Sequence, residues 1–328
     1  MAARSAGEED QMPRAVPGRD LLAPALLVIA LVAAACGGAG RSRGGPGPAT
    51  GEAAFPVTVS AANGEVTIGA RPERIVSLSP TSTELLFAIG AGDQVVAVDD
   101  NSNYPPEAPM TDLSGFAPNV EAVAEFEPDL VVLSDDVNDI VESLGALDIP
   151  VMLHPAAEVL DDTYSQIEQL GAATGHVGEA AELVASMRSE IEELAASAPE
   201  FEEPPTYYHE LDQTFFSATS NTFIGQVYSL VGLENIADEA KGGGPYPQLS
   251  SEFIIDADPD LILLADTKCC GVTAEKVARR PGWDQITAVK TGAVVELDDD
   301  VASRWGPRIV DLLRVVVGEV SELQTVGG

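Results

Sequence analysis

Cysteine and histidine, the side chains most often used in metal centres and nucleophilic sites, are scarce in this chain of 328 residues, which has three of each. Cys269 and Cys270 are adjacent and lack the C-x-x-C spacing of zinc and thioredoxin-like sites. In an oxidising compartment they could form a disulfide or stay as two thiols. His154, His176 and His209 are far apart in the sequence. We therefore expect no metal centre and no resident cofactor.

Sequence motifs that carry catalytic chemistry are also missing. The chain has no H-E-x-x-H segment and no phosphate-binding glycine loop. Gly242–Gly244 come directly before Pro245, which indicates a hinge or turn and not a phosphate cradle. We expect that the protein is not an enzyme.

The most informative pattern is an internal repeat. Residues 119–133 (NVEAVAEFEPDLVVL) align with residues 250–264 (SSEFIIDADPDLILL). Each copy reads as a helix cap, a glutamate two positions later, a short helix, Pro-Asp and an apolar strand. The proline ends each helix because the residue before a proline avoids helical angles. Two copies in two halves of the chain predict two similar lobes.

The repeat places Glu121 and Glu252 at equivalent positions, in the first turn of equivalent helices. A carboxylate there stabilises the helix dipole, so a local structural role is one explanation. The other explanation is docking, because two matched carboxylates on two lobes could meet arginines of a symmetric partner. Such contacts fix the orientation of the two partners and raise the rate of their association more than they raise the affinity.

The N-terminal segment predicts export. Arg14 and Arg19 precede an apolar run, Leu21–Ala35, that has the length of a signal peptide, and Cys36 follows three small residues. This is the pattern of a bacterial lipoprotein signal, in which the cysteine becomes the acylated first residue. We expect Cys36 to carry the lipid. An uncleaved anchor and a plain signal are the alternatives.

Strands and helices alternate in the remaining chain. This order favours an α/β fold with mostly parallel sheets covered by helices. Thr81 and Glu84 read as a capping box that opens a helix. A long helix over residues 178–198 separates the repeat copies, and we expect it to bridge the lobes without joining either core. The expected divisions are a signal peptide (1–35), a flexible tether (36–54), an N-terminal lobe (55–160), a linking region (161–200) and a C-terminal lobe (201–328).

The charge of the chain is strongly negative. Its formal net charge is −36, and no Lys or Arg occurs between Arg74 and Arg188. A nucleic-acid partner is excluded on this basis, because phosphate binding needs a basic surface. We interpret the acidity as a solvated surface.

From Pro56 to about Leu323 the chain resembles the helix-linked (class III) periplasmic solute-binding proteins of ABC importers for cobalamin, ferric siderophores and heme. The resemblance implies two Rossmann-like lobes joined by a single long α-helix, with the ligand in a cleft between them. It also implies that Glu121 and Glu252 dock to arginines of a permease dimer that works with an ATPase. The matching motifs are RIVSLSPTSTELLFAIG, NYPPEA, NVEAVAEFEPDLVV, GPYPQLSSE and DDDVASRWGPR.

The motifs are most similar to those of vitamin B12-binding members, which implies a corrinoid ligand. Exposed aromatic rings suit such a large, flat molecule. Phe215 and Phe216 should point in opposite directions on a strand, and we choose Phe216 as the ligand contact. The predicted contacts are Tyr104, Phe116, Phe216, Tyr246, Asp300, Arg304 and Trp305.

Other functions stay open. A ferric siderophore is the main alternative, although such sites often gather arginines, and the first lobe offers almost none. Heme would want an axial tyrosine or histidine. A non-transport surface sensor is a further alternative. The expected protein is monomeric and lipid-anchored on the outer face of the cytoplasmic membrane, with a small-molecule ligand and an ABC importer as partners.

Overall fold

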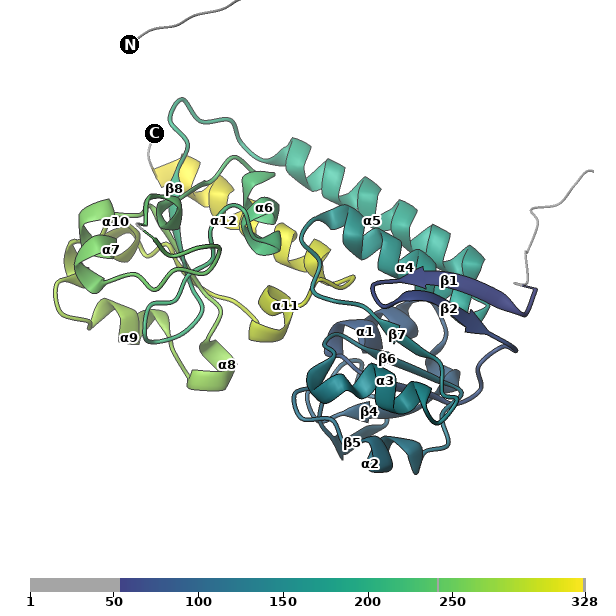
Figure 1. Ribbon diagram of the computed structural model, residues 1–328. Helices are drawn as coiled ribbons and strands as arrows, with labels where there is room; N and C mark the ends of the chain where they lie inside the picture. Colours follow the sequence, from purple (N-terminus) through teal and green to yellow (C-terminus); the bar gives the residue numbers. More distant parts are fainter. Residues whose placement is uncertain (1–53, 241, 327–328) are drawn as a thin grey trace, which may run out of the picture. The chain divides into compact units, whose positions relative to one another are not determined.

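The computed structural model describes residues 54–240 and 242–326. The predicted signal peptide, the lipid site at Cys36 and nearly all of the tether lie outside the described residues. Residues 54–326 belong to one compact unit. Within it, Figure 1 shows two α/β lobes, the N-lobe and the C-lobe, together with a set of long helices. No helix in the described part combines the length and apolar character that crossing a bilayer requires.

The N-lobe is built on a five-stranded parallel sheet with the strand order β5-β4-β3-β6-β7. A two-stranded antiparallel hairpin of β1 and β2 precedes it. The strands are β1 (Val57–Ala61), β2 (Gly64–Ile68), β3 (Ile75–Leu78), β4 (Val95–Asp99), β5 (Met110–Leu113), β6 (Leu130–Leu133) and β7 (Val151–Leu153). The helices are α1 (Pro80–Ala88), η1 (Gly92–Gln94), α2 (Val120–Ala124), η2 (Val137–Asp139) and α3 (Ile140–Gly145).

The C-lobe is built on a four-stranded parallel sheet with the order β11-β10-β8-β9. Its strands are β8 (Thr206–Glu210), β9 (Glu234–Asn235), β10 (Leu261–Leu264) and β11 (Val294–Glu296). Its helices are α6 (Phe223–Ser229), η3 (Ile236–Glu239), α7 (Ser251–Ala257), α8 (Thr267–Cys270), α9 (Ala274–Ala278), η4 (Trp283–Gln285), α10 (Thr287–Thr291) and α11 (Asp299–Ser303). Parallel sheets in both lobes agree with the predicted fold class.

The internal repeat forms the same unit in both lobes. Asn119 caps α2 by accepting a hydrogen bond from the N–H of Ala122 (2.9 Å), and Ser250 caps α7 in the same way, from the N–H of Phe253 (3.1 Å). The Pro-Asp step leads each copy into a central strand, β6 or β10. The predicted similarity of the two lobes is confirmed at this unit.

The aspartate of each Pro-Asp step has a role that the sequence did not reveal. The Asp129 carboxylate accepts from the backbone N–H groups of Glu73 (2.8 Å) and Arg74 (3.0 Å), just before β3. The Asp260 carboxylate accepts from the N–H of Thr206 (2.9 Å), the first residue of β8. Each aspartate therefore ties its strand to the start of the neighbouring parallel strand.

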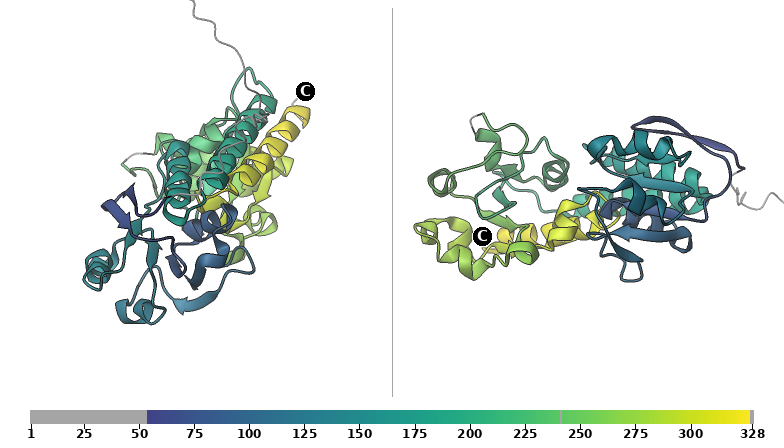
Figure 2. Two further views of the ribbon diagram at one scale, coloured as in Figure 1. Left: turned by 90° about the vertical axis from the view of Figure 1, so that its right-hand side faces the viewer. Right: turned by 60° about the horizontal axis from the view of Figure 1, so that its bottom comes forward.

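Three longer helices lie along the junction of the lobes. The chain passes from the N-lobe sheet to the C-lobe sheet through α4 (Leu160–Thr174) and α5 (Val177–Ser197), and α12 (Ile309–Val326) packs against α5. The left view of Figure 2 shows α12 beside α5. The buried face of α5, which includes Val184, Met187 and Ile191, packs in one apolar cluster with residues of both sheets, such as Leu130 and Leu261. The expectation that the long helix joins neither core is therefore wrong. Its apolar face is buried against both lobes because α4 and α12 pack on either side of it.

Neighbouring residues of the central strands face different clusters, as the two-residue period of a strand requires. Leu261 and Leu263 face the shared cluster, while Ile262 and Leu264 pack with Trp283 in a separate cluster of the C-lobe. In the N-lobe, Val131 and Leu133 belong to a third cluster. Both sheets are thus buried on both faces, which is typical of parallel sheets.

The first helix of the N-lobe differs from the prediction. It begins at Pro80, and the hydroxyl of Ser79 accepts from the N–H of Ser82 (3.3 Å). Proline suits this first position because its missing N–H needs no partner there. The predicted capping box of Thr81 and Glu84 is therefore wrong. Glu84 lies further along the helix, and its side chain is free for another use.

Candidate ligand-binding and docking sites

Four of the predicted ligand contacts are aromatic rings that the fold leaves exposed. The exposed fractions are 43% for Tyr104, 78% for Phe116, 37% for Phe216 and 54% for Tyr246. Tyr104, Phe116 and Phe216 follow the carboxyl ends of β4, β5 and β8. Ligands of parallel α/β sheets bind at this edge. Aromatic rings at the mouth of such a site can bury a large part of a bound ligand.

The C-lobe aromatics lie on two chain segments that pair with each other. The N–H of Ser217 donates to the carbonyl of Pro247 (2.9 Å), and the N–H of Leu249 donates to the carbonyl of Phe215 (2.9 Å). This pairing brings the segment of Phe216 beside the segment of Tyr246. Phe215 stacks on Trp283, with 5.7 Å between ring centroids, so the more exposed ring of the two is Phe216. Its ligand role stays a prediction.

The aromatic residues nearer the lobe junction have partners within the protein. The Arg308 guanidinium lies 4.3 Å from the ring centroid of Tyr104. The indole N–H of Trp305 donates to Gln166 on α4 (2.9 Å), and the Trp305 carbonyl accepts from the Thr163 hydroxyl (3.0 Å). Trp305 therefore ties the C-terminal segment to the helices that join the lobes.

Arg304 is buried, with 8% of its surface exposed. Its guanidinium donates to Glu84 of the N-lobe (2.8 Å), to the side chains of Asn103 and Asp300 (both 2.9 Å) and to the carbonyl of Asn101 (3.0 Å). Sequence reasoning assigned Arg304 to the ligand, whereas the structure engages it between the lobes.

Asp300 is held in the same set of contacts. It accepts from the Asn103 amide (3.1 Å) and from Lys268 (3.1 Å), in addition to Arg304. Burial acts to raise the pKa of Asp300, but the charge of Arg304 and the hydrogen bonds of Asn103 and Lys268 lower it overall. Asp300 is thus an ionised group that joins α11 to the N-lobe.

The adjacent cysteines form a disulfide in α8, and both are exposed. The Asp299 carboxylate, at the first residue of α11, accepts from the N–H groups of Thr267 (2.8 Å) and Cys269 (2.8 Å), so it caps this short helix. Although burial opposes it, these backbone hydrogen bonds lower the pKa of Asp299. The disulfide helix α8 is therefore held against the start of α11, the helix that also carries Asp300.

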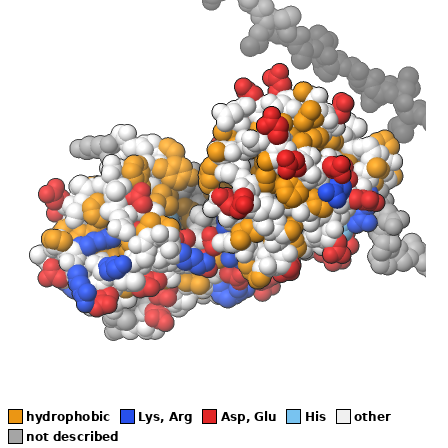
Figure 3. Space-filling model, turned by 90° about the horizontal axis from the view of Figure 1, so that it is seen from below, with side chains coloured by type: hydrophobic (Ala, Val, Ile, Leu, Met, Phe, Trp, Pro, Cys, Tyr) orange, Lys and Arg blue, Asp and Glu red, His pale blue; other side chains and the backbone are white. Residues whose placement is uncertain are grey.

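Glu121 and Glu252 are exposed in the first turns of α2 and α7. The cap side chains Asn119 and Ser250 already satisfy the helix starts. Neither carboxylate has a hydrogen-bond or ion-pair partner in the part of the chain that the structure describes. Figure 3 shows Lys and Arg side chains gathered mainly over the C-lobe, while acidic and apolar side chains dominate the N-lobe face. Both carboxylates are therefore available to a cationic partner.

A second buried glutamate lies in the C-lobe and was missed by sequence reasoning. Glu210, the last residue of β8, is fully buried and accepts from both terminal nitrogens of Arg280 (2.5 Å each). Beside it, Asp266 is also fully buried, and neither of its carboxyl oxygens has a hydrogen-bond partner. Burial, and then the charge of Glu210, raises the pKa of Asp266 to about 7. Asp266 is therefore close to the midpoint of its titration at neutral pH and protonated below it.

No group of three or more His, Cys, Asp or Glu side chains suited to a metal ion occurs in the described part of the chain. Burial lowers the pKa of both His154 and His209 to about 4, so both are neutral and structural at physiological pH. His176 contacts Arg71 (2.9 Å) at the start of α5.

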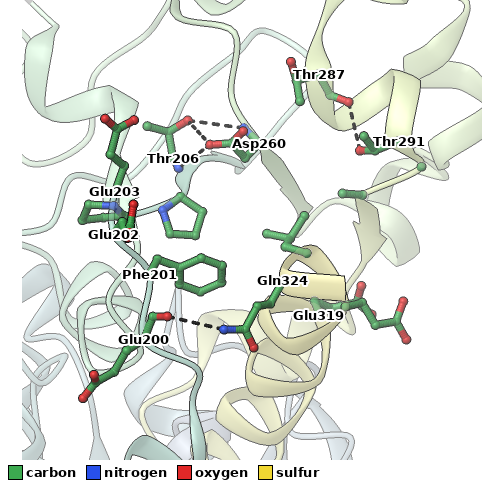
Figure 4. Close-up of a pocket in the computed structure, with 16 residues that line it drawn as sticks. Glu200, Phe201, Glu202, Glu203, Thr206, Asp260, Thr287, Thr291, Glu319 and Gln324 are labelled. Carbon is green, nitrogen blue, oxygen red and sulfur yellow. Dashed lines mark hydrogen bonds between the residues drawn. The ribbon is translucent and has the colours of Figure 1, made fainter. Parts of the chain in front are cut away.

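A hollow of about 790 Å³ lies away from the predicted site (Figure 4). Its lining includes Thr206, Asp260 and Ala293, which stand at or just before the starts of β8, β10 and β11. These are the amino ends of the strands. The predicted ligand contacts follow the opposite, carboxyl ends, so this hollow is not their site.

Comparison with known proteins identifies the family. A family model described as periplasmic binding protein matches residues 75–301. The chain belongs to the periplasmic binding protein family. It is 32% identical over 297 residues to an uncharacterized ABC transporter substrate-binding lipoprotein, YvrC, of Bacillus subtilis, and the match covers 88% of this chain and 92% of that protein.

Two further similarities concern proteins named for a ligand. A cobalamin-binding protein of Halobacterium salinarum is 34% identical over 273 residues, which are 78% of this chain and 72% of that protein. The structure of the periplasmic heme-binding protein RhuT from Roseiflexus sp. RS-1 superimposes with a TM-score of 0.68 at 26% identity, covering 77% of this chain and 99% of RhuT. The protein is thus an extracytoplasmic substrate-binding protein of the ABC transporter class, with a small-molecule ligand and a transporter as partners.

Proposed function

We propose that the protein is a lipoprotein, anchored through Cys36, that captures a corrinoid between its two lobes and delivers it to the permease dimer of an ABC importer. The supporting observation is the set of four exposed aromatic rings, Tyr104, Phe116, Phe216 and Tyr246, beside the carboxyl ends of both sheets. The cobalamin-binding relative points to the same ligand class. Aromatic faces bury much of a large, flat molecule at small entropic cost.

The charge near these rings favours an uncharged ligand over an anionic one. Arg304 and Lys268 are already paired with carboxylates, and no Lys or Arg occurs between Arg74 and Arg188. A ferric siderophore with net negative charge would therefore find little compensating charge in the N-lobe. A cobalamin, which has no net negative charge, avoids this cost.

The ligand assignment is tested with the mature chain carrying Cys36→Ser, which prevents acylation. Cyanocobalamin, a ferric siderophore and heme are titrated separately, with heat and absorbance as readouts. We expect saturable binding of cyanocobalamin at one site per molecule, and Phe216→Ala with Tyr246→Ala should weaken it by at least ~100-fold, about 2.7 kcal/mol. Preferential binding of the siderophore or heme would replace the corrinoid assignment, and silence toward all three would remove the ligand class.

Docking to the permease is the second part of the proposal, and it is supported by the matched, exposed Glu121 and Glu252. Replacing both with alanine should abolish uptake and leave the ligand dissociation constant unchanged. Glu125 and Asp256 provide a matched control, because they are exposed, acidic and four positions further along the chain, at the C-terminal cap of α2 and within α7. Alanine at both control positions should leave uptake intact. Normal uptake by the Glu121→Ala/Glu252→Ala variant would contradict the docking role.

A further inference from the structure

One buried carboxylate holds two arginines across the lobe junction. Glu84 on α1 of the N-lobe is 3% exposed. It accepts from Arg304 (2.8 Å) and, through both carboxylate oxygens, from Arg308 (2.9 and 2.5 Å). Both arginines follow α11, at the C-lobe end of the chain segment that leads into α12. We call Glu84, Arg304 and Arg308 the inter-lobe clamp.

The composition of the N-lobe explains why these charges come from elsewhere. A buried carboxylate needs a cation or several hydrogen bonds, because it has lost its hydration. The sequence between Arg74 and Arg188 contains no Lys or Arg. Arg74 itself donates to backbone carbonyls at Phe126 and Glu127. Glu84 is therefore neutralised by arginines from the other end of the chain, and its burial depends on the two lobes lying together.

We propose that Glu84 is a positioning residue that, through Arg304 and Arg308, fixes the relative placement of the lobes and hence the spacing of the two docking carboxylates. The proposal rests on the docking function assigned to Glu121 and Glu252. Those carboxylates lie on separate lobes, on α2 and α7, and within the described residues the chain passes from one sheet to the other once, through α4 and α5. Two arginine sites at a fixed spacing on a permease can be met together only when the lobes keep one arrangement.

The clamp also touches residues predicted to contact the ligand. The guanidinium of Arg308 lies over the ring of Tyr104, and Arg304 shares Asp300 and Asn103. A ligand that engages Tyr104 or Asp300 therefore meets direct partners of the clamp. Occupancy of the ligand site and placement of the lobes are linked through these contacts.

The test compares two buried glutamates that differ in where their arginine partners lie. Glu84 pairs across the lobes, whereas Glu210 pairs with Arg280 inside the C-lobe. Spin labels on Glu125→Cys and Asp256→Cys, in the chain with Cys36→Ser and without reductant, report the distance between α2 and α7. Pulsed electron paramagnetic resonance should give one narrow distribution for the parent protein. Glu84→Gln should broaden or shift it, and Glu210→Gln should leave it unchanged.

A functional measurement accompanies the distances. In reconstituted transporter, the concentration of Glu84→Gln protein that half-maximally stimulates ATP hydrolysis should rise ~10-fold, about 1.4 kcal/mol, while Glu84→Asp should recover part of this loss because it keeps the charge. A general loss of stability would not separate Glu84→Gln from Glu210→Gln in this assay. A Glu84→Gln distance distribution that superimposes on that of the parent protein would overturn the proposal.

If Glu84→Gln does not fold, Arg308→Lys replaces it, because lysine keeps the charge but loses the two-pronged contact. It should broaden the distribution, and an unchanged distribution would then overturn the proposal. The distance measurement needs no permease. A failure of the docking proposal would show instead as normal uptake by the Glu121→Ala/Glu252→Ala variant.

Discussion

The two lobes share the helix, Pro-Asp and strand unit but compensate buried charge in different ways. In the C-lobe, Glu210 pairs with Arg280 of the same lobe, and burial raises the pKa of the neighbouring Asp266 to about 7. In the N-lobe, Glu84 takes both of its arginines from beyond the junction. The buried Glu210 of the C-lobe is therefore compensated by an arginine of its own lobe, whereas the buried Glu84 of the N-lobe is compensated by arginines of the other lobe. This difference teaches that a shortage of cations in one half of a sequence can couple two halves of a fold.

The largest expected effect is on stability when the buried glutamates are truncated. Glu84→Ala leaves two arginines without their carboxylate, which should lower the free energy of unfolding by ~3–5 kcal/mol. Glu210→Ala should cost less, because Asp266 can ionise and pair with Arg280 in its place. Urea unfolding followed by circular dichroism measures both. Equal losses would show that Asp266 does not substitute, and that the lobes do not differ in this respect.

Each lobe contains one buried histidine, so both lobes should lose a similar amount of stability as the pH falls below neutral. Burial lowers the pKa of His154 in the N-lobe and of His209 in the C-lobe to about 4, below the usual 6.5 or so. The unfolded chain binds protons between these values while the folded chain does not, so stability is lost as the pH falls from about 6.5 to 4. Each histidine accounts for at most ~3 kcal/mol at pH 4.

Removing one of these histidines should reduce the slope of the unfolding free energy against pH, because the unfolded chain then binds one proton fewer in this pH range. Thermal unfolding of His154→Leu and His209→Leu between pH 7 and pH 4 measures the slope against that of the parent protein. A slope that stays the same in His154→Leu but falls in His209→Leu would place the acid sensitivity in the C-lobe alone.

Between pH 5 and pH 7 the stability should depend on pH through Asp266, a buried carboxyl of the C-lobe. Burial raises its pKa to about 7, so the folded chain holds a proton that the unfolded chain releases near pH 4. The stability that this proton provides is complete at low pH and is lost as the pH rises to about 7. The stability gained by Asp266→Asn relative to the parent protein should therefore grow between pH 5 and pH 7, by at most ~1.4 kcal/mol per pH unit, and stay constant above. A gain that does not vary with pH would contradict this protonation.

The smallest expected effect concerns the exposed ring of the N-lobe. Phe116 is 78% exposed, so Phe116→Ala should change the free energy of unfolding by less than ~0.5 kcal/mol. In contrast, Phe215→Ala should destabilise the C-lobe, since Phe215 stacks on Trp283. If Phe116→Ala also leaves ligand affinity unaltered, this N-lobe ring has no part in binding. The C-lobe rings, Phe216 and Tyr246, would then be the aromatic contacts that remain to be tested.

Much of the architecture was predictable from local sequence. The repeat predicted two lobes, because a cap residue, a proline and an apolar run specify a helix end and a strand without distant contacts. The start of α1 was misplaced, since Ser79 and Pro80 act before the capping box that Thr81 and Glu84 resemble. The shared core of α5 was missed because the periodic apolar residues show that a face is buried but not what covers it.

The site residues also include some whose surroundings local sequence could predict and some whose surroundings it could not. Phe216 is the more exposed of the two neighbouring rings, but the strand alternation from which it was chosen is absent, because Phe215 lies beyond the end of β8 and has a positive φ of 68°. Arg304 and Asp300 were assigned to the ligand on resemblance, and the structure engages both with partners more than 190 positions away in the sequence. Glu84 stands among the apolar residues of α1, and this position could have suggested that it is buried and paired with an arginine such as Arg304.

The sequence by itself determined the α/β class, the two matched units with Glu121 and Glu252, and the poverty of cations in the first half. These depend on neighbouring residues or on composition. Only the tertiary structure decided which charges meet, since Glu84 and its two arginines stand at opposite ends of the chain. A buried ion pair is selected by desolvation and geometry after the lobes come together, and neither quantity is written in the spacing of residues.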